Sequence, residues 1–172
     1  MTAVLLALVF APMLVEARRA AANERAQLAR GGLEAQGDVY GVMRIAYPAA
    51  FLLMIAEGAW RGAATGMFFR TGLLLFAAAK VLKWSAILAL GPAWTFRVIT
   101  VPRAPLVTAG PYRLFRHPNY VGVIGELAGI GLMSGALISG PIATIGFGLL
   151  ILKRIAIEER ALTSPQSPIP TP

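Results

Sequence analysis

The sequence predicts an all-α protein, a polytopic membrane helix bundle of about five transmembrane helices that ends in a helical hairpin. Of the 172 residues, 57% are hydrophobic and only 14% are charged, and the mean hydropathy is +0.68. A soluble domain of this length has too little interior to bury so much apolar surface. The basic residues flank apolar stretches, as topology signals do. One domain over residues 1–162 therefore lies in the membrane, and a Pro/Ser-rich tail over 163–172 is expected to be disordered.

The first apolar stretch, residues 2–15, predicts a membrane helix. A signal peptide is the alternative, but no basic region precedes the stretch, and the pair Arg18-Arg19 follows it instead. Residues 16–38 carry many charges and the break Gly31-Gly32. They predict a solvated helix and loop that lie along the membrane surface.

Two further spans are expected at residues 42–60 and 67–90. The third contains Lys80 and Lys83, which lie three residues apart and therefore on one helical face. Ammonium groups that face lipid are costly, so we expect this face to turn inward, toward a polar cavity. Gly91-Pro92 ends the span, and a polar segment follows over 91–119.

The run Val121–Leu152 has 32 residues and one charge, Glu126. As a single helix it would be about 48 Å long, well beyond the hydrocarbon core of about 30 Å. Ser134-Gly135 and Ser139-Gly140-Pro141 supply turn residues near its middle. The run therefore predicts a tight hairpin of two short spans.

With five spans, segments 16–38, 91–119 and 153–172 share one side of the membrane and hold most of the arginines. The positive-inside rule makes this side cytoplasmic and places the N-terminus outside. The hairpin then returns the end of the chain to the polar segment. Arg116 and His117 are expected to meet Arg154 and Glu158 there.

The stretch Gly110–Tyr120 contains the only histidine of the chain. His117 suits a general base, a cofactor contact, or a histidine satisfied at an interface. Tyr112 and Tyr120 beside it offer flat faces with hydroxyl groups, which suit a purine and a ribose. Arg154 and Glu158 are four residues apart on one helical face, so they either line a site or form an ordinary ion pair.

Glu126 lies within the first arm of the hairpin, where an unpaired carboxylate facing lipid is costly. Two interpretations remain open. Glu126 either pairs with Lys80 or Lys83 across the bundle, or contacts a substrate directly.

Composition excludes several kinds of site. Without cysteine and with one histidine, the chain has neither disulfides nor a thiolate or histidine-rich metal site. Glu158 and Glu159 lack a further nearby carboxylate, so no metal is expected. The net charge of +8 is not gathered on a soluble face, so nucleic acid is not an expected partner. The glycines around Gly122 and Gly129 follow no strand and favour close helix packing over dinucleotide binding.

Two motifs carry a family resemblance. They are Gly-Pro-Tyr-Arg-x-x-Arg-His-Pro-Asn-Tyr over 110–120 and, after the apolar hairpin, Arg-x-x-x-Glu-Glu-x-x-Leu over 154–162. Together they resemble the isoprenylcysteine carboxyl methyltransferase family of integral-membrane methyltransferases. The short chain and the upstream Lys83-Trp84 and Leu90-Gly91 are most similar to its bacterial branch, which includes alkylpyrone and alkylresorcinol O-methyltransferases. The resemblance covers residues 80–162 well and implies a bacterial inner membrane protein.

The resemblance implies a cofactor, S-adenosylmethionine, and a lipophilic small-molecule acceptor that enters from the membrane lipid between helices. Arg154 and Glu158 would be the catalytic residues, with Arg154 and Glu126 on the acceptor side. The cofactor pocket would face the cytoplasm. The residues implied to hold the cofactor are Ala104, Pro105, Leu106, Val107, Tyr112, His117, Pro118, Asn119, Tyr120 and Glu158.

The expected reaction is direct transfer of the methyl group to a carboxylate, enol or phenol oxygen. Positioning and exclusion of water would supply most of the acceleration, with Arg154 orienting and neutralising the oxyanion. Two departures concern the substrate: Ala22 stands where the branch tends to have arginine, and Tyr47 where it tends to have histidine. The alternatives are a membrane sterol-type reductase that uses NADPH, in which a similar Arg-His-Pro-x-Tyr hairpin occurs, and a non-catalytic membrane subunit.

Overall fold

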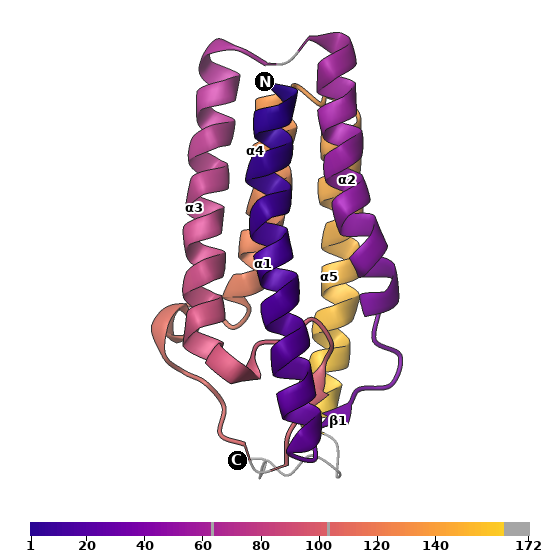
Figure 1. The fold of residues 1–172 in the computed structure, drawn as a ribbon, viewed down its shortest axis with the longest axis vertical. Coiled ribbons are helices and arrows are strands. Elements are labelled where there is room, and N and C mark those ends of the chain that lie inside the picture. The colour runs from indigo at the N-terminus through magenta and orange to yellow at the C-terminus, as the bar shows by residue number, and fades with distance from the viewer. Residues whose placement is uncertain (63, 103, 164–172) are drawn as a thin grey trace.

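The computed structural model describes residues 1–62, 64–102 and 104–163. Five long helices run roughly parallel or antiparallel along one axis (Figure 1). They are α1 (Thr2–Ala29), α2 (Tyr40–Arg61), α3 (Gly66–Leu90), α4 (Pro118–Ser134) and α5 (Ser139–Thr163). The expected all-α bundle with a C-terminal hairpin is confirmed. Of the expected tail, Thr163 ends α5, and residues 164–172 lie outside the described residues.

The short elements all lie at one end of the bundle (Figure 1). They are strands β1 (Leu33–Glu34) and β2 (Ile99–Thr100) and the 3-10 helices η1 (Gly91–Ala93) and η2 (Gly110–Arg113). The two strands pair antiparallel, with Leu33 opposite Thr100. This end, which we call the loop end, collects the segments that the sequence placed on one side of the membrane.

Among the residues that the structure describes, three helices are long and apolar enough to cross a membrane: Tyr40–Arg61, Gly66–Ala93 and Ser139–Leu162. Helix α4 has 17 residues, which corresponds to about 25 Å. In α1 the apolar stretch gives way to charged residues from Glu16 onward. These two helices complete a bundle built around the three candidate spans, as expected of an integral membrane protein.

The expectation that residues 16–38 lie along the membrane surface is wrong. Helix α1 continues without a break to Ala29 and stays parallel to the bundle. The physical reason for the continuous helix is that several polar side chains of this half, including Glu16 and Gln27, find partners inside the protein. Glu16 is 1% exposed and Gln27 is 5% exposed. The segment is thus part of the bundle, and only 30–39 forms a connection.

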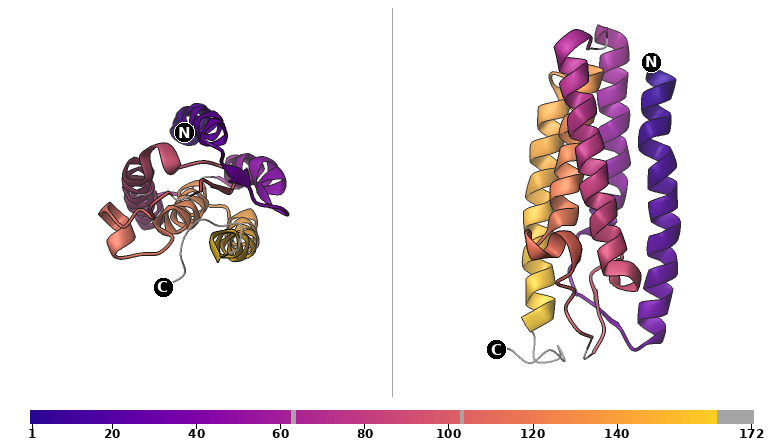
Figure 2. Two further views of the ribbon diagram at one scale, coloured as in Figure 1. Left: turned by 90° about the horizontal axis from the view of Figure 1, so that it is seen from below. Right: turned by 90° about the vertical axis from the view of Figure 1, so that its left-hand side faces the viewer.

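Helices α3 and α4 pack against each other along their length, and α4 also packs on α2 and α5. Glycine makes the α3–α4 approach possible. A Cβ at Gly129 would lie 2.8 Å from the Phe76 backbone nitrogen, and one at Gly122 would lie 2.8 Å from the Lys83 Cβ. Seen along the axis, α4 lies between α3 and α5, while α1 stands on the opposite side of the bundle (Figure 2). The glycines therefore serve close helix packing, as their pattern predicts.

The turn between α4 and α5 also follows the sequence. Gly135 ends α4 in the left-handed conformation, with φ of +74°. At the start of α5, Glu57 accepts hydrogen bonds from the Ser139 backbone N–H (2.7 Å) and hydroxyl (2.6 Å). This carboxylate ties α2 to the first turn of α5 at the end opposite the loops.

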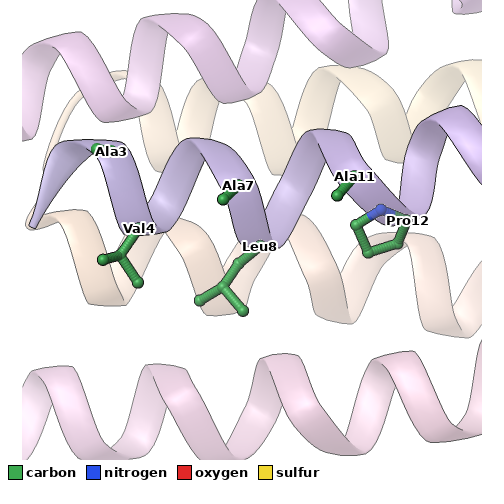
Figure 3. Close-up of a pocket in the computed structure, with 6 residues that line it drawn as sticks. All are labelled: Ala3, Val4, Ala7, Leu8, Ala11 and Pro12. Carbon is green, nitrogen blue, oxygen red and sulfur yellow. The ribbon is translucent and has the colours of Figure 1, made fainter.

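A shallow apolar groove runs along the N-terminal half of α1 (Figure 3). It is lined by Ala3, Val4, Ala7, Leu8, Ala11 and Pro12. It contains no polar side chain. The groups that can carry chemistry lie farther along the bundle, toward the loop end.

Candidate active site

The inner faces of four helices meet in a set of charged side chains that we call the lysine cluster. Its members are Glu16 of α1, Tyr47 of α2, Lys80 and Lys83 of α3, and Glu126 of α4. The two glutamates and Lys83 are each 3% exposed or less. The lysines face inward, as expected, but the expected polar cavity is replaced by a closed ionic cluster.

Each lysine in the cluster touches both glutamates. Lys83 Nζ lies 2.7 Å from Glu16 and 3.4 Å from Glu126, and the corresponding distances for Lys80 are 3.3 and 3.1 Å. The Tyr47 hydroxyl donates to Glu126 Oε2 at 2.7 Å. Glu126 Oε1 lies close to both ammonium groups without a well-aligned hydrogen bond. The ion pair of Glu126 with the lysines, one of the two interpretations left open, is therefore present.

A second set of polar side chains, which we call the Arg154 network, lies nearer the loop end. Its members are Asp38, Tyr120, Arg154 and Glu158. Arg154 Nε donates to the Tyr120 hydroxyl at 2.9 Å, and this hydroxyl donates to Glu158 Oε2 at 2.8 Å. Arg154 and Glu158 do not pair directly. Tyr120 from α4 joins them through one hydroxyl.

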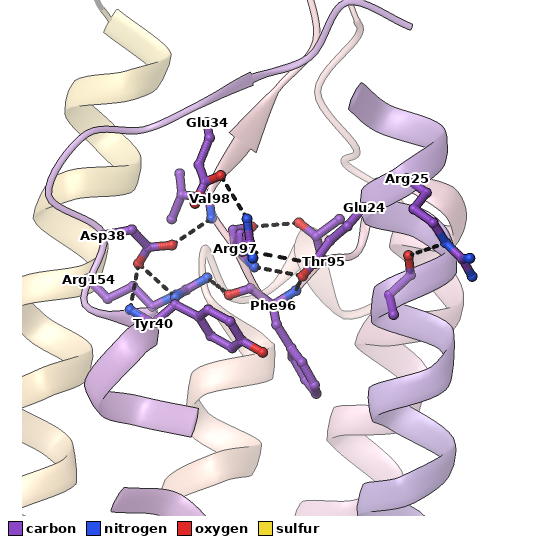
Figure 4. Close-up of polar contacts among 11 residues, drawn as sticks. Glu24, Arg25, Glu34, Asp38, Tyr40, Thr95, Phe96, Arg97, Val98 and Arg154 are labelled. Atoms are coloured by element: carbon purple, nitrogen blue, oxygen red, sulfur yellow. Dashed lines mark hydrogen bonds and ion pairs between the residues drawn. The ribbon is translucent and has the colours of Figure 1, made fainter. Parts of the chain in front are cut away.

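Asp38 holds Arg154 from the segment before α2 (Figure 4). Its Oδ1 lies 2.9 Å from Arg154 Nη1, and Oδ2 accepts a hydrogen bond from the Val98 N–H at 2.9 Å. Arg154 Nη2 donates to the Phe96 carbonyl. The Arg154 and Asp38 side chains are 7% and 5% exposed. Three separate chain segments thus fix one buried guanidinium.

The segment that supplies Phe96 and Val98 is itself held by α1. Asn23 donates to the Gly91 and Trp94 carbonyls at 3.0 and 2.7 Å, and Gln27 donates to the Pro92 carbonyl at 2.7 Å. In addition, Glu24 accepts from the backbone N–H groups of residues 96 and 97 (Figure 4). The polar half of α1 therefore orders the 91–98 segment that contacts Arg154.

The stretch Gly110–Tyr120 reaches the same end of α5, as the hairpin predicts. The His117 ring stacks on Tyr120 with centroids 5.6 Å apart. His117 Nε2 lies 3.8 Å and Arg116 Nη2 3.6 Å from Glu159 Oε1. Burial, with the negative charge of Glu158 as a second cause, raises the pKa of Tyr112 well above its ordinary value. Aromatic rings and a carboxylate therefore border one region.

Pro118 is buried and occupies the first turn of α4, where it sets the path of the chain after His117. Asn119 follows it, and its Oδ1 atom is buried without a hydrogen-bond partner among the described residues. A buried acceptor without a donor is costly unless a ligand or water completes it. Asn119 Oδ1 is thus available to a donor other than the described residues.

The strip Ala104–Val107 lies in irregular, largely exposed chain, and Leu106 is 60% exposed. Within the described part of the chain, no hydrogen bond or ion pair joins this strip to the Arg154 network. The structure therefore brings together Tyr112, His117, Tyr120, Arg154 and Glu158 but leaves the strip outside. Glu126 belongs to the lysine cluster.

Sequence reasoning missed Asp38 and Glu16 as partners of the charged residues. A polar residue just before an expected helix was a usable signal for Asp38, since such positions hold backbone N–H groups. Here Asp38 Oδ1 does accept from the Tyr40 N–H, at 3.1 Å. No local signal linked it to Arg154, which lies 116 residues away.

The residues present fit a cofactor that offers N–H donors, an aromatic base and a positive charge. Asn119 Oδ1 suits a donor, the rings of Tyr112, His117 and Tyr120 suit a flat base, and Glu158 suits a cation. In residues 1–62, 64–102 and 104–163, no group of three or more His, Cys, Asp or Glu side chains is placed to hold a metal ion.

Comparison with known proteins gives one family and two relatives. A sequence model of the isoprenylcysteine carboxyl methyltransferase (ICMT) family matches residues 72–164. The uncharacterized protein YpbQ of Bacillus subtilis is 27% identical over 158 residues, covering 92% of this chain and 94% of that protein. The cobalt-zinc-cadmium resistance protein CzcN of Cupriavidus metallidurans is 39% identical over 59 residues, 34% of this chain and 27% of that protein. No solved structure matches significantly.

Proposed function

This chain belongs to the isoprenylcysteine carboxyl methyltransferase family of membrane methyltransferases, and we propose from that premise that it uses S-adenosylmethionine to methylate an oxygen of a lipophilic acceptor. The acceptor oxygen is a carboxylate, enol or phenol. The reaction takes place at the cytoplasmic face of a bacterial inner membrane, which the arginine-rich loop end supports.

One observation carries the proposal: Tyr120 receives a hydrogen bond from Arg154 and donates one to Glu158. A single hydroxyl thereby joins the residue assigned to the acceptor and the residue assigned to the cofactor. Arg154 and Glu158 come from one turn of α5, and Tyr120 from the first turn of α4. The hairpin thus sets the spacing between the two halves of the site.

On the cofactor side, Glu158 is the group that attracts positive charge. Tyr112, His117 and Tyr120 offer rings to a flat base, and Asn119 Oδ1 accepts an N–H group. Pro118 fixes the start of α4, and the strip Ala104–Val107 is proposed to contact the cofactor from outside the Arg154 network. The cofactor supplies a methyl group activated by its sulfonium. These residues bind and orient it.

On the acceptor side, Arg154 orients the reacting oxygen. Three of its nitrogens already donate to Asp38, Phe96 and Tyr120. A guanidinium has five N–H groups, so two remain for an acceptor oxygen. A carboxylate or acidic enol is ionised at neutral pH and needs no dedicated base. The burial of Arg154 supports exclusion of water from the reacting groups.

A direct contact between Glu126 and the acceptor is part of the same proposal, but it requires the lysine cluster to open. Glu126 lies six residues beyond Tyr120, which corresponds to about 9 Å along the helix axis. At this distance from Tyr120, the Glu126 side chain would lie nearer to the apolar part of a bound acceptor than to its reacting oxygen. Glu126 is therefore proposed to line the acceptor path, while Arg154 contacts the oxygen.

The experiment is methyl transfer by purified protein in lipid nanodiscs. Protein is incubated with S-adenosylmethionine labelled in the methyl group and a bacterial lipid extract, and label is counted in the organic phase. Wild-type protein should transfer label, whereas Glu158→Gln should transfer little. NADPH should neither support a reaction nor compete. The absence of label with wild-type protein, under conditions in which another member of the family labels its acceptor, would contradict the proposal.

A further inference from the structure

Arg154 is the only cation within the Arg154 network, and its charge is already compensated. Asp38 Oδ1 lies 2.9 Å from Nη1, and both side chains are almost completely buried. The Phe96 carbonyl accepts from Nη2 on another side. A guanidinium placed in this way offers N–H groups for orientation, but it projects little positive field into the neighbouring pocket.

The network contains one guanidinium and two carboxylates, so it carries one excess formal negative charge. Two arginines of the 91–98 and 110–120 stretches, Arg97 and Arg116, face other carboxylates. Arg116 is 85% exposed and faces Glu159, whose Oε1 also faces His117. On the other side, Arg97 pairs with Glu24 and Glu34. Because Asp38 neutralises Arg154, the excess negative charge belongs to Glu158, which lies beside Tyr120 and Tyr112.

We propose that Asp38 is a positioning residue with an electrostatic role, in which it holds Arg154 and cancels its charge so that Glu158 keeps its attraction for a cationic cofactor. This inference rests on the proposed function, since the cation it addresses is the sulfonium of S-adenosylmethionine. Without Asp38, the guanidinium of Arg154 would neutralise Glu158 through the shared Tyr120 hydroxyl. The pocket would then have no preference for a positive ligand.

Asp38 also anchors the chain, since its Oδ2 accepts from the Val98 N–H and its Oδ1 from the Tyr40 N–H. An asparagine has one acceptor oxygen and keeps only one of these bonds, so a general loss of affinity reports anchoring, and a change in the preference for a charged ligand reports the electrostatic role. Only the contact with Arg154 requires a negative charge. Asp38 also lies outside residues 72–164, the part of the chain that matches the family model. The N-terminal half therefore supplies a counter-ion to a site whose other charged members lie in the C-terminal half.

The test compares the affinities of two ligands that differ in charge. S-adenosylmethionine has a positive sulfonium, whereas S-adenosylhomocysteine has a neutral sulfide in its place. Their ratio of dissociation constants is measured by calorimetry in nanodiscs without an acceptor. Asp38→Asn should shift this ratio by about threefold to tenfold against S-adenosylmethionine, the scale of one partly screened charge. Arg154→Gln should shift it in the opposite direction.

The double variant Asp38→Asn with Arg154→Gln restores one excess negative charge, so its ratio should return close to that of the wild type. Glu34→Gln is the matched control, because it removes a carboxylate from the same segment at an exposed position paired with Arg97. Its ratio should not change. If Asp38→Asn does not fold, Arg154→Gln can be compared with the double variant, because the two differ only at residue 38. Arg154→Gln alone should then favour the cationic ligand more than the double variant does.

An unchanged ratio in Asp38→Asn, with both ligands bound equally less well, would reduce Asp38 to a loop anchor and overturn the inference while leaving the proposed function intact. Ratios that move in the same direction in both single variants would also overturn it. Folded wild-type protein that binds neither ligand would instead overturn the proposed function and, with it, the inference.

Discussion

The lysine cluster and the Arg154 network both combine basic and acidic side chains, but they differ in net charge and in their position along the bundle. The cluster sets two ammonium groups against two carboxylates, all within the helices, and every charged member touches two of the others. The Arg154 network sets one guanidinium against two carboxylates where the helices meet the loops. Beside it lies Asn119 Oδ1, a buried acceptor without a partner among the described residues.

The difference separates a structural role from a binding role. Charges buried in a bundle are tolerated when each has a counter-ion, and a balanced set needs no ligand to neutralise it. A network with an excess carboxylate and an unpaired acceptor is incomplete without a ligand. The variants below should therefore affect the free energy of unfolding in the lysine cluster and ligand binding in the Arg154 network.

The largest expected effect is the loss of stability in Lys83→Met. Removing this ammonium leaves Glu16 and Glu126 with only Lys80 in a buried site, and breaking such a set costs about 3–5 kcal/mol. The thermal unfolding midpoint in detergent should fall strongly. The matched control is Lys153→Met on the exposed face of α5, which should leave the midpoint nearly unchanged.

Adding Glu16→Gln to Lys83→Met should recover much of this loss, because the buried charges are again balanced. A contrary result is a Lys83→Met protein with unchanged stability and impaired binding of S-adenosylhomocysteine. That result would make the lysine cluster part of the ligand site and would remove the contrast between the two regions.

The second largest expected effect is a loss of affinity for S-adenosylmethionine in Glu158→Gln. This change removes the charge of the side chain but keeps its size, and it converts a charge-assisted hydrogen bond with Tyr120 into a neutral one. The dissociation constant of S-adenosylmethionine should rise by about tenfold or more. Glu57→Gln, on α2 where Glu57 binds the first turn of α5 at the opposite end of that helix, should leave this constant unchanged. Equal losses in both variants would indicate general destabilisation of α5.

Tyr120→Phe should have a smaller effect, on both the stability of the protein and the rate of methyl transfer. It removes the hydroxyl shared by Arg154 and Glu158 and retains the ring that stacks on His117. We expect about 1 kcal/mol of lost stability and about a tenfold slower transfer, with the base-stacking face intact. Single-turnover transfer measures the rate separately from binding. An unchanged rate would show that the hydroxyl does not join the two halves of the site.

The smallest effect is expected in Arg116→Ala. Its side chain is 85% exposed and lies 3.6 Å from Glu159, and exposed ion pairs of this kind contribute less than about 0.5 kcal/mol. Stability and ligand affinity should both stay within error of the wild type. A clear loss of affinity would extend the binding site to the outer surface of the 110–120 stretch.

Signals that act over a few residues predicted most of the fold. Gly91-Pro92 ends α3, Gly135 ends α4, and the excess length of the 121–152 run required a turn. The same hairpin argument predicted that the stretch around Arg116 and His117 would meet Glu158, and Tyr120 of this stretch donates to Glu158 Oε2 at 2.8 Å. The helical spacing of Lys80 and Lys83 also predicted that both side chains face the interior of the bundle. These features follow from local sequence patterns and from the length of one apolar run.

Features that depend on distant partners could not be predicted in this way. Glu16 indicated the end of the first apolar helix, yet α1 continues because Lys80 and Lys83 neutralise the carboxylate inside the bundle. Asp38 lies 116 residues from Arg154, and only the assembled loop end brings the two together. The role of a charged residue in an apolar sequence can therefore be assigned only when its partner is known.

Direct binding of S-adenosylmethionine to purified, folded protein tests the central claim most directly, because it requires no knowledge of the acceptor. Calorimetry should show binding to the wild type and to Glu57→Gln, binding at least about tenfold weaker to Glu158→Gln, and no competition by NADPH. Folded wild-type protein that shows no binding, or binding equally strong in Glu158→Gln, would contradict the assignment of the Arg154 network as a cofactor and acceptor site.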